Sequence, residues 1–320
     1  MTSAPRVTLA MPVYNGENFI RKAIESLLAQ TFEDFELIIS DNASSDSTRE
    51  IITSYQRMDS RIRLIKNARN LGAAENQNLG FRESKGEYFK WCAHDDEIDP
   101  AYIEKLVAKL DENPELSLAF GKTICIDATG CEIPMIGKEM PEMLSADPVE
   151  RFFKSIMLMG ACFPIFGLFR RDVLVKTTLH RPYYGSDRAL LVEVALLGKL
   201  GFVPDVTFFN RDHDQRSLMI NDKLEKSLWQ YGVKDRRAAA EHLNFLQHLF
   251  EIARRHPDVA SPVRLQLAAL RFALEPYQIG RYVMECTGFV SPGTARLMKW
   301  SADRLFRPTS GFMKPFKGNS

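Results

Sequence analysis

Short apolar segments alternate with amphipathic ones over the first hundred residues, and this alternation restricts the folds open to the chain. Four apolar runs are typical of buried strands: residues 7–14, 35–40, 61–66 and 88–93. After the first run, Ile20, Ile24 and Leu27 recur at the spacing of one helix face. Strands that alternate with such helices indicate βαβ units. The sequence therefore predicts an α/β fold with a mostly parallel central sheet flanked by helices.

Beyond the first hundred residues the pattern is less regular and then becomes helical. Further elements are expected as strands at 116–127, 165–169 and 202–210 and as helices at 148–158 and 188–200. From about residue 221 onward the pattern is helical, and prolines divide it into short helices. We therefore expect an α/β domain over residues 1–220 and a helical C-terminal extension over residues 221–320.

Charge is divided unevenly between these two regions. The 320 residues include 42 Lys and Arg against 41 Asp and Glu, a formal net charge of +1 that argues against a nucleic-acid-binding protein. Residues 1–220 hold 26 basic and 32 acidic side chains, whereas residues 221–320 hold 16 basic and 9 acidic ones. We expect the acidic region and the basic region to have different roles.

The sequence shows no pattern typical of export or membrane insertion. The first residues lead directly into a strand pattern without an apolar signal segment, and no uncharged stretch reaches the ~20 apolar residues of a spanning helix. The five cysteines are odd in number and lack CxxC spacing, which argues against a zinc site or a disulfide framework. We therefore expect a cytoplasmic protein, with peripheral contact to the inner face of the membrane as an open alternative.

Polar side chains follow three of the four early strands. Tyr14 comes after the first strand, Asp41 after the second, and Asp95 and Asp96 after the fourth. Ligands of open α/β sheets bind beyond the carboxyl ends of the strands. An aromatic ring can stack on a base, a carboxylate can accept a hydrogen bond from it, and an acidic pair can hold a divalent cation. Each feature alone also suits a helix cap or a solvated turn. Together they predict a site for a nucleoside diphosphate.

Several segments of the sequence occur in a recognisable order. The first four are VTLAMPVYNG, FELIISDNASSDST, NLGAAENQNLGFRESKGEY and AHDDEIDP. They resemble the N-terminal half of the family 2 glycosyltransferases, which are GT-A fold enzymes that use nucleotide sugars. A fifth segment, GSDRALLVEVALLGKLGFVPDVTFFNRDHDQRS, is similar to a block in the second half of that family. The resemblance covers about residues 5–218.

This resemblance implies a Rossmann-like GT-A fold and an inverting glycosyl transfer. The sugar would move from a nucleotide-diphosphate sugar, with a UDP-sugar as the expected donor, to a hydroxyl group. The acceptor would be a saccharide or a lipid-linked molecule in polysaccharide, lipopolysaccharide or glycolipid synthesis.

The resemblance also assigns residues to the nucleotide site. It implies that Pro12 and Tyr14 wall the nucleobase pocket and that Asp41 bonds the base. It further implies that Asp95 and Arg211 lie near the pyrophosphate.

A divalent metal, Mn²⁺ or Mg²⁺, is part of the same expectation. The family's Asp-x-Asp motif falls on residues 93–95, so Ala93 replaces its first aspartate. The resemblance implies that Asp95 is the principal metal ligand, with Asp96 as the neighbouring carboxylate and His213 as a further ligand. Such cations often take only one or two protein carboxylates, with phosphate and water oxygens completing the shell.

Asp187 falls on the position of the family's catalytic base, and Ser186 replaces the glutamate that usually precedes it. The resemblance implies that Asp187 accepts the proton of the acceptor hydroxyl as that hydroxyl attacks the anomeric carbon. From its local sequence alone, Asp187 better suits the N-cap of a helix that begins at residue 188, and the resemblance is what favours the catalytic role.

Two other functions remain as alternatives. The replacements at Ala93 and Ser186 would suit a non-catalytic nucleotide-binding subunit of a polysaccharide-assembly complex. A nucleotidyltransferase on a similar sheet would need a Gly-rich basic loop after the first strand, and residues 15–18 are not one.

The basic C-terminal region also has two interpretations. It could be a helical cap that packs on the sheet domain or forms a homodimer. It could instead contact anionic lipid and bring the enzyme to a lipid-linked acceptor. The basic residues concerned are Arg264, Arg271, Arg281, Arg296, Lys299, Arg304, Arg307, Lys314 and Lys317.

Overall fold

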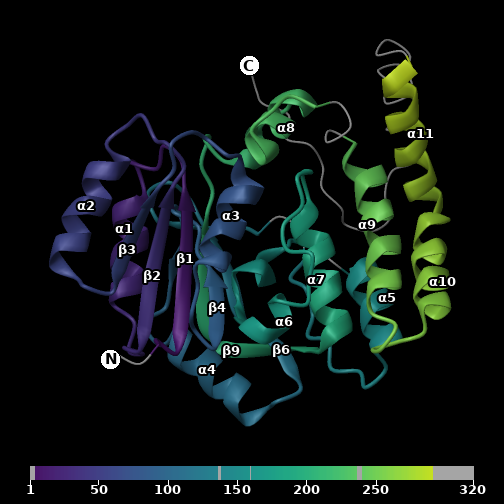
Figure 1. Ribbon diagram of the computed structural model, residues 1–320, viewed down its shortest axis with the longest axis horizontal. Helices are drawn as coiled ribbons and strands as arrows, with labels where there is room; N and C mark the ends of the chain where they lie inside the picture. The colour runs from purple at the N-terminus through teal and green to yellow at the C-terminus, as the bar shows by residue number, and fades with distance from the viewer. Residues whose placement is uncertain (1–3, 136–137, 159, 236–239, 291–320) are drawn as a thin grey trace.

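The computed structural model describes residues 4–135, 138–158, 160–235 and 240–290 (Figure 1). At its centre is a nine-stranded sheet in the order β3-β2-β1-β4-β8-β6-β9-β5, with β7 paired to β6. The strands are β1 (Val7–Val13), β2 (Phe35–Asp41), β3 (Ile62–Lys66), β4 (Tyr88–Trp91), β5 (Glu97–Ile98), β6 (Leu116–Ile126), β7 (Glu132–Ile133), β8 (Leu168–Arg170) and β9 (Lys199–Arg211).

The strands that lead to the polar loops run in the same direction. β1 pairs in parallel with β2 and β4, β2 pairs in parallel with β3, and β6 pairs in parallel with β9. β8 lies antiparallel between β4 and β6. Because helices cover both faces, β1 and β2 are buried almost throughout. The predicted α/β fold with a largely parallel sheet is confirmed.

Helices pack against both faces of the sheet. Side chains of α1, α2 and α4 join those of β1 and β2 in one apolar cluster, whereas α3, α5 and α7 contribute to a second. The helices are α1 (Ile20–Leu28), α2 (Thr48–Met58), α3 (Ala73–Arg82), α4 (Tyr102–Glu112), α5 (Pro148–Leu158), α6 (Arg171–Leu174), α7 (Ser186–Leu197), α8 (Lys223–Tyr231), α9 (Glu241–Arg255), α10 (Pro262–Ala273) and α11 (Pro276–Val290).

The expected C-terminal helices are present as α8 to α11, and two of them share the core of the sheet region. Phe245 and Leu249 of α9 and Leu265 of α10 belong to the same buried cluster as α5 and α7. In Figure 1, α9 and α10 stand beside α5 at the edge of the molecule remote from β3. Six of the predicted basic residues, from Arg296 onward, lie outside the described residues.

No helix within the described ranges combines the length and the apolar character that a membrane crossing requires.

One predicted strand is largely wrong. The apolar run 165–169 begins as a 3-10 helix, η1 (Phe163–Phe166), and becomes strand β8 only at Leu168. Pro164 lies in the first turn of η1, where its missing N–H costs no hydrogen bond, whereas it would interrupt a strand ladder. The two-residue strand β5 was not predicted, because it exists only through pairing with β9.

Candidate active site

The candidate site lies where β1, β2 and β4 reach their carboxyl ends. Val13 and Asp41 are partners at the ends of β1 and β2, and the Asn42 N–H donates to the Val13 carbonyl at 2.8 Å. The loop after β4 lies against the loop after β1, since a Cβ on Gly16 would be 2.6 Å from Cδ2 of His94. Glycine at position 16 therefore lets these two loops approach closely.

Asp95 and His213 are brought together by the loops after β4 and β9. The Nε2 atom of His213 lies 2.8 Å from Oδ2 of Asp95, and the ring of Phe19 lies 4.5 Å from the His213 ring. Burial disfavours the Asp95 carboxylate, but the charge of His94 and the His213 hydrogen bond outweigh it and lower the pKa of Asp95. The predicted principal metal ligand is therefore held ionised beside an imidazole.

Arg211 lies beneath this pair with no exposed side-chain surface. Its Nε donates to the Asp95 carbonyl at 2.9 Å, its Nη1 donates to the Asp127 carbonyl at 3.0 Å, and its Nη2 pairs with Glu97. These contacts hold the Asp95 loop in place. A direct contact between Arg211 and a pyrophosphate would require that loop to rearrange.

Asp96 points into the protein interior. Its Oδ1 accepts hydrogen bonds from the Arg211 N–H at 2.8 Å and from Nδ2 of Asn210 at 3.2 Å. Burial, and then the charge of Asp95, raises the pKa of Asp96 well above its ordinary value. A carboxyl with a raised pKa is a weaker metal ligand, because a ligand oxygen must be deprotonated.

The donor set at this edge is small. Within the described ranges, no group of three or more His, Cys, Asp or Glu side chains is arranged to hold a metal ion. The Asp95 carboxylate and the His213 imidazole nevertheless lie within hydrogen-bond distance of each other. This pair fits a cation that takes its remaining ligands from a diphosphate and from water.

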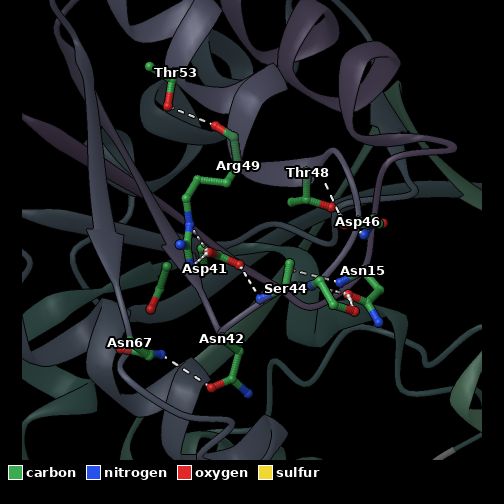
Figure 2. A network of polar contacts seen from close by, with 12 residues as sticks. Asn15, Asp41, Asn42, Ser44, Asp46, Thr48, Arg49, Thr53 and Asn67 are labelled. Atoms are coloured by element: carbon green, nitrogen blue, oxygen red, sulfur yellow. Dashed lines mark hydrogen bonds and ion pairs between the residues drawn. The ribbon is translucent and has the colours of Figure 1, made fainter.

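The predicted base-binding residues lie at the carboxyl ends of β1 and β2 or directly after them. Pro12 is half-buried in β1, and Tyr14 is 45% exposed. Asp41, in contrast, has no exposed side-chain surface. Arg49 of α2 covers it, with Nε 2.9 Å and Nη2 2.7 Å from Oδ2, and the Ser44 N–H donates to Oδ1 at 2.9 Å (Figure 2). The Arg49 side chain, which is 38% exposed, therefore lies between Asp41 and solvent.

Asparagine side chains tie the loop after β2 to the start of α3. Nδ2 of Asn67 donates to Oδ1 of Asn42 at 3.2 Å (Figure 2). Nδ2 of Asn42 donates in turn to Oδ1 of Asn70 at 2.9 Å. The Leu71 N–H donates to Oδ1 of Asn42 at 2.9 Å. Gly72 follows with φ 83°, a left-handed conformation that glycine adopts without steric cost. The network fixes the loop that borders Asp41.

Asp187 lies in the first turn of α7, just after Gly185 with φ 87°. Its Oδ1 accepts a hydrogen bond from the Arg188 N–H at 2.9 Å. Burial raises the pKa of Asp187, and the hydrogen bond and charge of Arg188 only partly offset it. A carboxylate with a raised pKa suits a general base. Because α7 begins at Ser186, Asp187 is inside the helix rather than its N-cap.

The structure joins some of the predicted site residues and leaves others apart. Asp95, His213 and Arg211 form one connected group. No hydrogen bond or ion pair within the described part of the chain connects Asp187 to Asp95 or His213.

Two residues at the site were not predicted. Phe19 packs on His213, and its ring centroid lies 5.4 Å from the Arg211 guanidinium carbon. Arg49 pairs with Asp41 from the first turn of α2. The sequence did show a basic residue, Arg49, eight positions after the carboxylate at the end of a buried strand. That spacing alone does not establish that the two side chains pair.

A cavity lies at the opposite edge of the sheet. It measures about 420 Å³ and is bordered by the first residues of β6 and β9 and by Arg151 and Arg170. Both guanidinium groups donate to main-chain carbonyls, Arg151 to Ala195 and Leu196 and Arg170 to Leu110 and Leu116. These cations are already partnered, and the edge is not the one at which α/β sheets bind ligands.

The chain is similar to proteins of known family. The model of glycosyl transferase family 2 matches residues 8–174. An uncharacterised glycosyltransferase of Rickettsia typhi is 29% identical over 216 residues, which are 67% of this chain and 58% of that protein. The Campylobacter jejuni GalNAc(5)-diNAcBac-PP-undecaprenol beta-1,3-glucosyltransferase is 26% identical over 191 residues, 59% of this chain and 60% of that protein. The matches thus span less than two thirds of the length of either relative.

Solved structures share the fold. TarS of S. aureus in complex with UDP-GlcNAc aligns with a TM-score of 0.55 and 16% identity, covering 88% of this chain and 79% of that one. Mannosyltransferase PcManGT of Pyrobaculum calidifontis, in complex with GDP-Man and Mn²⁺, aligns with a TM-score of 0.55 and 18% identity, covering 96% and 82%. These likenesses identify the α/β architecture as the GT-A fold.

Proposed function

Because this chain belongs to glycosyl transferase family 2, we propose that it transfers a sugar from a nucleoside-diphosphate sugar to a hydroxyl group, with inversion at the anomeric carbon. The observation that carries this proposal is the sheet edge where ionised Asp95 meets His213, beside the loops that follow β1 and β2. A UDP-sugar is the expected donor. The UDP-GlcNAc complex of TarS supports a UDP-sugar donor. Because PcManGT binds GDP-Man, GDP-sugars are also tested as donors.

Asp95 and His213 would hold a divalent cation, Mn²⁺ or Mg²⁺, together with the donor diphosphate. The Mn²⁺ in the PcManGT complex supports this part of the proposal. Such a cation supplies positive charge that stabilises the leaving nucleoside diphosphate. Arg211 keeps the Asp95 main chain in position through its hydrogen bond to the Asp95 carbonyl.

Asp187 is the proposed general base. Its carboxylate would accept the proton of the acceptor hydroxyl as the oxygen attacks the anomeric carbon. Burial raises the pKa of Asp187, which strengthens its carboxylate as a base. Pro12, Tyr14 and the pair of Asp41 and Arg49 would border the nucleobase.

A donor panel tests this function. UDP-, dTDP- and GDP-sugars are incubated with the protein, and free nucleotide is measured with Mn²⁺, with Mg²⁺ and with a chelator. We expect release from one nucleotide class, with UDP-sugars first, and loss of release with the chelator. Equal release with and without the metal would overturn the metal part. Nucleotide binding without release from any donor, with a panel of saccharide acceptors present, would favour the non-catalytic subunit.

We propose further that α10 faces the cytoplasmic side of a membrane that carries a lipid-linked acceptor. The Campylobacter relative, whose name includes an undecaprenol-linked acceptor, supports this assignment. The outer face of α10 is aliphatic and strongly exposed at Val263, Leu267 and Leu270, and the exposed Leu274 follows directly after the helix. Arg264 and Arg271 border this face, and α10 contains no acidic residue. Exposed apolar stripes of this kind mark interaction surfaces.

Liposome flotation tests the membrane contact. We expect the protein to float with vesicles that contain anionic lipid and to remain below in zwitterionic ones, and we expect Leu267→Glu to abolish flotation. Met58→Glu, which adds the same charge at an exposed apolar residue of α2, is the control. A concentration-dependent dimer in solution that Leu267→Glu converts to a monomer, with no flotation, would instead assign the face to a second copy of the chain.

A further inference from the structure

The loop that leads to Asp187 is held by a helix from the C-terminal region. Residues 175–185 connect α6 to α7, and α9 packs beside them, although the two segments are about 70 positions apart in sequence. Oγ1 of Thr178 lies 2.7 Å from Nε2 of His248, and the Tyr183 hydroxyl lies 2.9 Å from Nδ1 of the same ring. One imidazole of α9 therefore bridges two points of the loop.

The hydrogen-bond directions in this bridge follow from the partners. Oε2 of Glu193 accepts from the Thr178 N–H at 2.8 Å and from the Thr178 hydroxyl at 2.9 Å. The Thr178 oxygen is then free to accept from Nε2–H of His248, which leaves Nδ1 to accept from the Tyr183 hydroxyl. The donors of this series of hydrogen bonds therefore all point in one direction, from Tyr183 through His248 and Thr178 to Glu193. This arrangement requires a neutral His248.

Burial supports that protonation state. The pKa of His248 is lowered to about 4, mainly by burial, so the ring stays neutral near pH 7. Glu193 has no exposed surface, and Nε2 of His256 lies 2.8 Å from its Oε1. A buried polar network of this kind stabilises one arrangement when every member is partnered.

Other contacts reinforce the same junction. Arg181 of the loop pairs with Glu251 of α9, and the Arg188 guanidinium carbon lies 4.6 Å from the Phe245 ring centroid. Arg188 is the residue whose N–H donates to Asp187. The loop and the first turn of α7 are thus attached to α9 on both sides of Asp187 in sequence.

We propose that His248 is a positioning residue for glycosyl transfer, and that α9 sets the place of the Asp187 carboxylate through the Tyr183–His248–Thr178–Glu193 chain. This inference rests on the proposed role of Asp187 as the base. His248 does not touch substrate. It holds two points, Thr178 and Tyr183, of the loop that leads to Asp187. A displacement of about 1 Å in a reacting group can lower a rate about 100-fold.

Three variants of the chain test the proposal. His248→Phe removes both hydrogen bonds, Tyr183→Phe removes one hydroxyl, and His248→Gln keeps a donor that can reach Thr178. We expect kcat to fall about 10- to 100-fold in His248→Phe and less in the other two, while the Kd for the donor's nucleoside diphosphate stays unchanged. His242→Phe is the matched control, because His242 lies on the same helix but pairs with Glu285 of α11. We expect its kcat to match that of the unaltered protein.

The pH profile separates positioning from a general loss of structure. Loosening the loop admits water to Asp187, which reduces the burial that raises the pKa of Asp187. The acidic limb of kcat/KM should therefore move to lower pH in His248→Phe and stay in place in His242→Phe.

The outcomes distinguish this inference from the function on which it rests. Turnover by Asp187→Asn close to that of the unaltered protein would overturn the base assignment itself. Loss of turnover in Asp187→Asn together with unchanged kcat and pH profile in folded His248→Phe would overturn the positioning role alone. Equal losses in kcat and in nucleotide affinity in His248→Phe would assign the network to general stability, which also contradicts the proposal.

Discussion

Arg49 covers a carboxylate that has no solvent-exposed surface. The Asp41 side chain accepts hydrogen bonds from the Arg49 guanidinium and from the Ser44 N–H, so its charge is compensated by the protein itself (Figure 2). A nucleobase that reaches this loop meets the exposed side of Arg49 before it meets Asp41. Asp41 can therefore form the predicted hydrogen bond to a nucleobase only if the Arg49 side chain moves away from it.

Removing the Arg49 charge should destabilise the fold. Arg49→Gln leaves the buried Asp41 carboxylate without its cation, and such a loss costs about 1–3 kcal/mol or more. Chemical denaturation measures the free energy of unfolding. Arg57→Gln, a substitution at an exposed arginine of the same helix, should leave that free energy unchanged. Equal stability of the two variants would mean that the Asp41 pairing contributes nothing to the fold.

His180 is a buried residue that no proposed function uses. Among the described residues neither ring nitrogen has a hydrogen-bond partner, and the ring packs edge-on against Trp91 at 4.8 Å between centroids. Burial lowers the pKa of His180 to about 3. In the unfolded chain a histidine has a pKa near 6.5.

His180→Phe should therefore reduce the acid sensitivity of the protein. Below about pH 6.5 the unfolded chain gains a proton at His180 that the folded protein does not, so folding stability falls as the pH falls, by about 1.4 kcal/mol per unit. The variant loses this contribution. Denaturation curves at pH 6 and pH 5 should show a smaller loss of stability in His180→Phe. Parallel pH dependence in the two proteins would show that His180 is protonated in the folded state.

Among the secondary-structure elements, the hydrophobic pattern of the sequence predicted the strands that lead to the site. Residues 7–14, 35–40 and 88–93 correspond to β1, β2 and β4, because each is an apolar run long enough to stand alone as a buried strand. β5 and β8 are two and three residues long. Elements so short are defined by their partners in the sheet, and a local pattern carries no information about partners.

The contact between α3 and α8 depends on two glycines. A Cβ on Gly72 would lie 2.5 Å from the Gly232 nitrogen, and φ at Gly72 is 83°. Gly72→Ala should therefore lower the free energy of unfolding by about 1–3 kcal/mol, through backbone strain and displacement of α8. Gly280→Ala in α11, where a Cβ meets nothing within 4 Å, should be neutral or stabilising. Thermal unfolding of both variants checks this, and equal melting temperatures would contradict the close approach.

At the scale of the whole molecule, the division of charge does not coincide with a division of the core. α9 and α10 contribute buried side chains to the cluster that also contains α5 and α7. The boundary predicted near residue 220 stays a prediction. The described structure shows that helices beyond it complete the apolar packing on one side of the sheet.

The sequence predicted those site residues that come directly after a strand or fall on a motif position. Asp95 and Asp187 were predicted from their motif positions. The side chains that contact them were not predicted. The pairs Asp41–Arg49 and Asp95–His213 and the bridge through His248 join residues that are 8, 118 and 70 positions apart. Tertiary packing decides which of these side chains meet. These contacts and the burial that accompanies them raise or lower the pKa of residues such as Asp95 and His248, and neither can be read from the sequence.

We propose Asp187 as the base of the glycosyl transfer. The most direct measurement is turnover of the preferred nucleotide sugar by Asp187→Asn, with nucleotide affinity measured on the same preparation. Asp172→Asn, which alters an exposed carboxylate in the first turn of α6, is the control. We predict that Asp187→Asn binds the nucleotide normally and loses turnover by about 100-fold or more, while Asp172→Asn is unaffected. Near-normal turnover in Asp187→Asn would contradict the claim.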